Sequence, residues 1–417
     1  MHTNKDTFLR IVRSLWIGLF LAVFSVSGMK AQTDLRITDD NPMAMPPVGA
    51  YGLRVLTPTI LELTLIHTKP KEASTVSEWN FVSNGSFSAP STSEFVVTAN
   101  EQTVGVQSVG FKRRPLYAPL NYRDLRICSQ IYLRLNSPIA DNQTVTVKNP
   151  SGKLWGTDKD FTADTNPLRF NPAIHVNAEG YMPNHVKKAM VGYYLGSMGE
   201  MSIPAGSGFR LISNSNGAVV YTGSLTLRKD VGYTYSPAPY QQVYEADFSS
   251  FNTPGEYRLQ VPGMGVSFPF VIDEGIAAMF ARSYGLGLYH QRCGHSNAHP
   301  HTRHEKGICH AKPVLIPDMT FTAVNNTLAS VTADYASSQS GAPQLKDVNS
   351  SLYPFVNKAP FDAQGGHHDA GDYSKYTINV AQLAHSLMFA VDAFPGVAEL
   401  DNLGLPESGD GISDVMQ

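Results

Sequence analysis

The sequence predicts a multidomain protein with an all-β sandwich, a second β-module and then a helical segment. Short β-rich runs separated by Pro, Ser, Asn and Gly fill residues 45–150, and the same texture returns at 173–273. At Ile276 the apolar residues change to helical spacing. Because the chain has 417 residues, 42% of them hydrophobic, it is long enough for two or three packed domains.

The charge composition argues against a nucleic-acid partner. The net charge is −3 and only 16% of the residues are charged, so the sequence carries no basic footprint.

Residues 1–31 have the pattern of a signal peptide. Basic residues precede an apolar run at 15–24, and Ala31 offers a small residue for cleavage. This run is short for a membrane span, although an uncleaved anchor is the alternative interpretation. No later segment is apolar enough to cross a bilayer. We therefore expect a secreted or periplasmic protein.

The first module, 45–150, is expected to be a β-sandwich, because its apolar runs are short and are bounded by turn-forming residues. The runs lie at 60–66, 95–98, 104–106, 131–135 and 145–147. They carry no visible catalytic constellation, so the role of this module is left open. A linker is expected at 150–172.

The second module, 173–273, contains the clearest turn signals of the chain. Asn216-Gly217 separates β-rich runs at 209–212 and 218–221 and is a strong hairpin signal. Pro254-Gly255 then turns the chain into a further run at 256–261. A second sheet-based domain is the expected result.

The last segment, 276–417, is expected to begin with an amphipathic helix from Ile276 to Tyr289. Another helix is expected after Asp372, where apolar residues at 380–391 keep the helical period until Phe394-Pro395-Gly396 ends it.

Two carboxylates lie just before this helix, Asp369 and Asp372, in a glycine-rich run from Gly365 to Tyr376. The glycines give the backbone the freedom to aim both carboxylates at one spot. Because close carboxylates repel, one of them gains proton affinity, as in a general base that activates water. A helix N-cap at Asp372 with Asp369 as its solvated neighbour explains the spacing equally well.

Cysteine and histidine gather earlier in the segment. Cys293 and Cys309 bracket a histidine-rich loop, and His310 follows the second cysteine. In a secreted chain two cysteines predict a disulfide, whereas thiolates with imidazoles also suit tetrahedral zinc. The composition does not decide between a disulfide and a zinc site, and with three cysteines in all at least one stays unpaired.

Three motifs resemble those of glycoside hydrolase family 9, the cellulase-like inverting enzymes. The run from His368 to Asp372 is similar to the family's His-Asp-Ala-Gly-Asp signature, and 405–414 is similar to its Pro-Glu-Ser-Gly-(Asn/Asp)-Gly segment. Residues 176–183 resemble the start of the immunoglobulin-like domain that precedes many of its catalytic domains. The resemblance implies an immunoglobulin-like β-sandwich at 173–273 and, at 276–417, the N-terminal part of an (α/α)6 barrel.

The resemblance also implies roles for individual residues. Asp372 corresponds to the catalytic base, and Asp369 to the carboxylate that helps to hold the water. Tyr373 and His367 are the expected substrate-binding residues, with His367 standing where the family commonly has Trp. The general acid is a Glu that the resemblance assigns to no position of this sequence, and Glu407 is not that residue.

A structural zinc site is implied at Cys293, Cys309, His310 and His368. Such a metal would tie a surface loop to the loop that carries Asp369. Calcium is a further candidate cofactor, because hard cations favour clustered oxygens. Its candidate ligands are Glu407, Asp410 and Asp414, which otherwise order the loop or cap a helix.

The implied function is hydrolysis of β-1,4-glucosidic bonds with inversion, with a β-glucan as the partner. From Ile276 to Gln417 the chain is shorter than the roughly 200 residues that twelve helices need, so it is expected to be incomplete and inactive alone. The alternative is a non-catalytic glycan-binding or scaffold protein. A zinc hydrolase is disfavoured, because the sequence has no His-Glu-x-x-His pattern.

Overall fold

The computed structural model describes most of the chain as two compact units, Met1–Ile276 and Ala277–Gln417. The residues that it describes are 35–38, 44–69, 76, 78–117, 124–204, 206–228, 242–313, 360, 362–371 and 373–417. The expected signal peptide at 1–31 and Asp372 lie outside these residues. Among the described residues, no helix has both the length and the apolarity needed to span a membrane.

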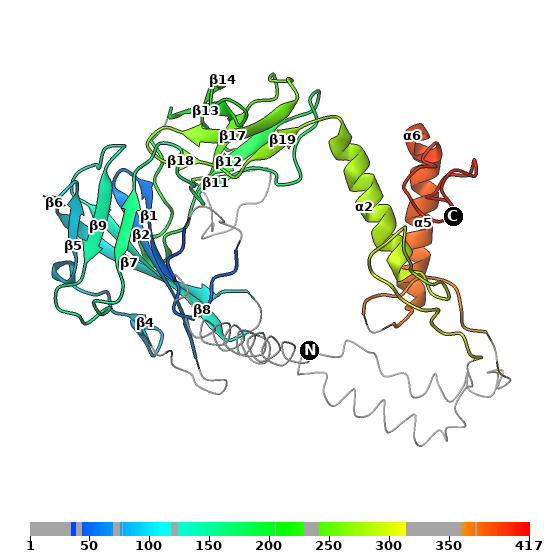
Figure 1. Cartoon of the computed structure of the whole chain (residues 1–417), viewed down its shortest axis with the longest axis horizontal. Coiled ribbons are helices and arrows are strands. Elements are labelled where there is room, and N and C mark those ends of the chain that lie inside the picture. The colour runs from blue at the N-terminus through cyan, green and yellow to red at the C-terminus, as the bar shows by residue number, and fades with distance from the viewer. Residues whose placement is uncertain are drawn as a thin grey trace, which may run out of the picture. The chain divides into compact units, whose positions relative to one another are not determined.

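The first β-module is a sandwich of two four-stranded antiparallel sheets, shown in colours from blue through cyan to green in Figure 1. The strand orders are β1-β2-β8-β7 and β10-β9-β5-β6, with a small β3-β4 ribbon beside them. The elements are β1 (Tyr51–Thr57), β2 (Ile60–Thr68), β3 (Val82–Ser83), β4 (Ser86–Phe87), η1 (Thr92–Glu94), β5 (Val96–Ala99), β6 (Gln102–Val104), β7 (Val106–Pro115), β8 (Arg126–Leu135), β9 (Thr144–Lys148) and β10 (Phe161–Asp164).

Alternate residues of these strands fill the space between the two sheets. Leu61, Leu63 and Ile131 from one sheet and Val145 and Val147 from the other belong to one buried apolar cluster. Because side chains alternate across a strand, the residues between them face outward. The predicted sandwich is therefore present, but the linker expected at 150–172 is partly wrong. Strand β10 pairs with β9 and completes the second sheet.

The second β-module, green in Figure 1, is also built from two sheets. The strand orders are β11-β12-β16-β15 and β14-β13-β17-β18, and β19 also pairs with β17. The elements are β11 (Ile174–His175), β12 (Lys188–Val191), η2 (Gly196–Met198), β13 (Gly208–Ser213), β14 (Val219–Ser224), β15 (Thr226–Leu227), β16 (Tyr244–Asp247), β17 (Gly255–Val261), β18 (Gly265–Val266) and β19 (Phe270–Ile272). The hairpin expected at Asn216-Gly217 is confirmed, since β13 and β14 pair across it and Gly217 has a φ of 70°.

The two β-modules share one apolar cluster within the first unit. Leu56, Ile60 and Tyr132 of the first module are buried together with the core of the second. Asn171, between the modules, donates from Nδ2 to the carbonyl oxygens of Leu56 at 2.7 Å and of Met264 at 2.9 Å. The modules therefore pack as one body with a polar link at its seam.

The second unit holds the helices α2 (Gly275–Gln291), α5 (Thr377–Ala393) and α6 (Pro395–Ala398) among the residues described. The two helices expected from the apolar spacing are thus confirmed. Proline begins α6 directly after α5, a position at which its missing N–H costs nothing. These helices do not define a closed barrel, so the barrel stays a prediction.

Candidate functional site

The last turn of α2 and the segment 362–371 form a short backbone ladder. The N–H of Cys293 donates to the carbonyl of Gly366 at 2.9 Å, and that of His368 donates to the carbonyl of Gln291 at 2.7 Å. Between these bonds Arg292 and His367 form an antiparallel bridge. The ladder therefore fixes Cys293 and His368 close together, although they are far apart in the sequence.

The loop after α2 brings Cys309 and His310 to the same place. Asn297 and Lys306 bridge within this loop, and the N–H of Gly294 lies 3.3 Å from the Sγ of Cys309. The Lys306 ammonium donates to the carbonyls of His290 at 3.1 Å and of Arg292 at 3.2 Å. A cation is favourable there, because the C-terminal carbonyls of a helix are electron-rich.

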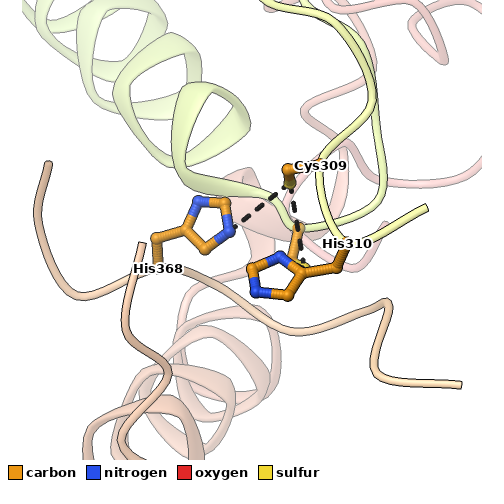
Figure 2. Close-up of side chains that lie close together, drawn as sticks. Cys309, His310 and His368 are labelled. Carbon is orange, nitrogen blue, oxygen red and sulfur yellow. Dashed lines mark hydrogen bonds between the residues drawn. The ribbon is translucent and has the colours of Figure 1, made fainter. Parts of the chain in front are cut away.

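Four potential metal ligands meet at this point: Cys293, Cys309, His310 and His368. Their ligand atoms all lie within 4.8 Å of one another. Figure 2 shows the side chains of Cys309, His310 and His368 close together, with His368 on a different segment from the other two.

Three of the distances between the ligand atoms are close to the edges of a tetrahedron around zinc. With Zn–S of about 2.3 Å and Zn–N of about 2.0 Å, two sulfurs lie about 3.8 Å apart, and sulfur and nitrogen about 3.5 Å apart. Cys293 and Cys309 have their Sγ atoms 3.9 Å apart. The Sγ of Cys309 is 3.5 Å from Nε2 of His368, and the Sγ of Cys293 is 3.3 Å from Nδ1 of His310.

The same distances do not fit a disulfide. A disulfide bond is about 2.05 Å long, whereas these sulfurs are 3.9 Å apart, and none of the three cysteines forms a disulfide. Cys128, the third cysteine, is buried in the first unit, where burial raises its pKa to about 11.

Local electrostatics favour the metal-binding forms of these side chains. Burial raises the pKa of Cys309, but the Gly294 N–H and the neighbouring His310 and Cys293 outweigh it and hold this pKa at about 7. Burial, together with Lys306, lowers the pKa of His368 below its usual value. Metals bind thiolate and neutral imidazole, so both shifts favour coordination.

Asp369 follows His368 directly and lines a small cavity of about 240 Å³. The side chain of Asn379, in the first turn of α5, donates from Nδ2 to Oδ1 of Asp369 at 2.7 Å. Among the residues described, Oδ2 of Asp369 has no protein donor and stays available to accept from water. Gln291 and Tyr376 line the same cavity. The position of Asp372 relative to it lies outside the described residues.

The two expected substrate-binding residues have different environments. His367 is half-buried and lines the cavity beside Asp369, and burial together with Arg292 lowers its pKa. The Tyr373 ring packs against the His368 ring, with centroids 4.7 Å apart, and Lys306 lies 5.6 Å from its centroid. Tyr373 is still 43% exposed, so sugar stacking on it stays a prediction.

The Pro-Glu-Ser-Gly segment is ordered by its own carboxylates. Glu407 pairs with Arg292, the residue before Cys293. Asp414 accepts from the N–H of Leu403 at 2.7 Å and from the Ser408 hydroxyl at 2.8 Å. Within the described chain these acids form no cluster of three metal ligands, so the geometry does not support the calcium site. The alternative role, loop ordering, fits their contacts.

Sequence reasoning missed three residues that organise the site: Arg292, Lys306 and Asn379. Each acts through a contact with a distant part of the chain, respectively with Glu407, with the end of α2 and with Asp369. Their only sequence signal is closeness to a cysteine or to the start of a helix. A single chain cannot reveal such long-range pairs.

A family model supports the resemblance noted from the motifs. Residues 169–266 match the cellulase N-terminal ig-like domain. This match covers the second β-module up to β18, without β19, and a few residues of the chain that precedes it.

Among curated proteins, endoglucanase D of Acetivibrio thermocellus is 28% identical over 269 residues. These residues are 64% of this chain and 34% of that protein, so the chain spans about a third of the length of the curated relatives it matches. With the family-model match, this relative confirms the resemblance to the family 9 cellulases.

Solved structures with partial similarity include a metagenome-derived glycoside hydrolase family 9 endoglucanase, at 25% identity and a TM-score of 0.43 over 58% of this chain and 38% of that one. A thermostable endoglucanase of Alicyclobacillus acidocaldarius has 21% identity and a TM-score of 0.39, covering 58% of this chain and 35% of that one.

Proposed function

We propose that this chain carries the β-modules and the water-activating loop of a secreted inverting glycoside hydrolase that cleaves β-1,4-glucosidic bonds in a β-glucan. The observation that carries the proposal is the place of Asp369. Asp369 follows His368, a ligand of the four-residue metal cluster, and lines a cavity. One of its carboxylate oxygens accepts from Asn379, and the other has no protein donor among the described residues.

The two carboxylates have different proposed roles. In an inverting hydrolase one carboxylate activates water on the face of the sugar opposite the leaving group, and an acid protonates the leaving oxygen. We assign Asp372 as the base and Asp369 as the group that orients the water. Asn379 supports the role of Asp369, because its hydrogen bond leaves one oxygen of that carboxylate for the water.

We propose that the metal is zinc and that its role is structural. Four protein ligands fill a tetrahedral ion, so no position is left for substrate or water. When bound, the ion would join the loop after α2 to the segment of His368. This cross-link would hold Asp369 in a fixed position at the edge of its cavity.

The assignment of the carboxylates predicts that Asp372→Asn and Asp369→Asn each lower kcat on soluble β-glucan at least about 100-fold, because general base catalysis contributes on that scale. Turnover is measured as reducing-sugar release by the natural protein that contains this sequence, since the resemblance assigns the general acid to no residue here. The matched control is Asp392→Asn, an exposed acid on α5 that should change nothing. Full activity of Asp372→Asn would refute the assignment.

A further inference from the structure

The first β-module has a pocket of about 580 Å³ between the end of β9 and the loop at 149–160. Small-molecule sites commonly have volumes of roughly 300–1,000 Å³ and combine apolar or aromatic walls with a few polar groups. Trp155 and Val147 supply the apolar wall, and Lys148, Thr157 and Asp160 supply polar groups. The pocket lies outside the segment matched by the family model.

The wall of this pocket is held rigidly from behind. Trp155 is only 7% exposed and packs against Phe161, with ring centroids 4.7 Å apart. The next residue back, Leu154, donates from its N–H to Oδ1 of Asn149 at 2.9 Å and accepts from the indole N–H of Trp79 at 2.8 Å. A pocket fixed in this way needs little ordering when a ligand binds, which favours affinity.

Glu94 fixes the tip of the same loop. Its carboxylate accepts from Ser151 and from the ammonium of Lys153, and its carbonyl accepts from the side chain of Asn149 at 2.7 Å. The side chains of Ser151, Lys153 and Asn149 are thus hydrogen-bonded to Glu94. The indole N–H of Trp155, in contrast, has no acceptor among the described residues.

The charges around the pocket favour a neutral ligand. The charge of Lys159 is balanced by Asp158, whose carboxylate lies 2.7 Å from the Lys159 ammonium. The charges of Lys148 and Asp160, which also line the pocket, are of opposite sign and sum to zero. A phosphate or carboxylate ligand would need an excess of cations, which these residues lack. A pyranose suits them better, because it has apolar C–H groups for the indole and hydroxyls that both donate and accept.

A row of hydroxyls continues from the pocket across the outer face of the sheet. The Thr162 hydroxyl donates to Asp160 at 2.8 Å and lies 3.1 Å from that of Thr146. Thr98 is paired with Thr146, and Thr103 with Thr98, so four threonines occupy one rung of β10, β9, β5 and β6. Neighbouring strands are about 4.8 Å apart, which gives an evenly spaced polar track.

We propose that this pocket binds a neutral pyranose unit of a glycan chain, with the threonine row contacting the units that follow. The first module is then a glycan-binding module. The choice of a β-linked glucose oligomer as its ligand rests on the proposed function, whereas the pocket itself does not.

The test uses Trp79 and Trp155, the two tryptophans of the first module, as reporters. In the full chain labelled with ¹⁵N-tryptophan, Trp155→Phe and Trp79→Phe assign the indole signals. Cellopentaose should shift the Trp155 signal saturably, with a Kd on the order of 1 mM. Asp160→Ala should weaken binding about five-fold, as expected for one lost hydrogen bond, whereas Glu179→Ala, an exposed acid of the second module, should not.

The possible outcomes test the glycan-binding pocket and the proposed β-glucan hydrolase function separately. If maltopentaose binds and cellopentaose does not, the pocket inference stands and the β-glucan assignment fails. The inference is overturned if no neutral oligosaccharide shifts the Trp155 signal saturably, if only an anionic oligosaccharide does so, or if Asp160→Ala binds as tightly as the parent chain.

Discussion

At the scale of single residues, the metal cluster depends on backbone bonds and on one unfavourable conformation. His310 has a φ of 54°, in the left-handed region that residues with a Cβ rarely adopt. Its imidazole nevertheless lies 3.3 Å from the Sγ of Cys293. A metal bond to His310 would offset the free-energy cost of this left-handed backbone conformation. The strained residue is therefore one that metal binding can stabilise.

His67 makes the first unit sensitive to pH. It is buried and lies 2.7 Å from the Ser129 hydroxyl, and burial, with a smaller effect of Arg113, lowers its pKa to about 4. Above its ordinary pKa of 6.5 the ring is neutral in both states. As the pH falls from 6.5 toward 4, the unfolded chain takes up a proton that the folded chain does not, so stability is lost in that window.

The predicted size of this loss is about 2 kcal/mol between pH 7 and pH 5. Urea unfolding followed by tryptophan fluorescence measures it, because the two tryptophans among the described residues, Trp79 and Trp155, lie in the first unit. His67→Gln keeps a hydrogen-bonding group near Ser129 but does not titrate. The free energy of unfolding of this variant should therefore fall by about 2 kcal/mol less between pH 7 and pH 5 than that of the parent chain. An equal pH dependence in the two proteins would exclude His67 as its source.

The residues of the metal cluster show how far sequence reasoning reaches. The spacing of Cys293, Cys309 and His310 indicated a site but left disulfide and zinc open, because sequence does not give the distance between two thiols. The resemblance added His368. The structure then separates the alternatives, since sulfurs 3.9 Å apart fit a shared ion and not a bond. The geometry at Asp372 stays a prediction.

At the scale of elements, the outward face of β2 and β8 lies beneath the second module. Glu62 on β2 is fully buried and accepts from Gln130 on β8 at 2.7 Å and from the Tyr193 hydroxyl of the second module at 2.9 Å. Arg54 lies 3.7 Å from the other carboxylate oxygen. A buried carboxylate depends strongly on its donors, so this contact couples the two modules.

Tyr193→Phe should therefore destabilise the first unit by about 1–3 kcal/mol, because it removes one donor from a buried carboxylate without changing the ring. Urea unfolding measures the change in the free energy of unfolding. Tyr221→Phe is the matched control, since its hydroxyl lies 3.2 Å from that of Ser250 at an exposed position and should matter by less than about 0.5 kcal/mol. Equal effects of the two substitutions would contradict the coupling.

Sequence predicts elements better than their partners. Alternating and helical periods located most strands and both long helices, because those periods are local. They could not show that the stretch at 161–164 would pair with β9, nor that a polar residue such as Glu62 would be buried. Both depend on tertiary contacts between segments that are far apart in the chain.

At the scale of the whole molecule, the two units should respond differently to removal of metal. The four proposed ligands all lie in the second unit, and binding to the folded state stabilises only the unit that binds. Addition of EDTA should lower the unfolding temperature of the helical signal in circular dichroism while the transition seen by tryptophan fluorescence is unchanged. A fall of both, or of neither, would contradict this division.

The most direct test of the account is the metal content of the full chain. Elemental analysis of protein purified without chelator, together with thiol titration under denaturing conditions, should give one zinc per chain and three free thiols. His368→Ala should lower the zinc content or affinity at least about ten-fold, because it removes one of four ligands. Metal-free protein with a Cys293–Cys309 disulfide would contradict the claim that zinc fixes the loop of Asp369.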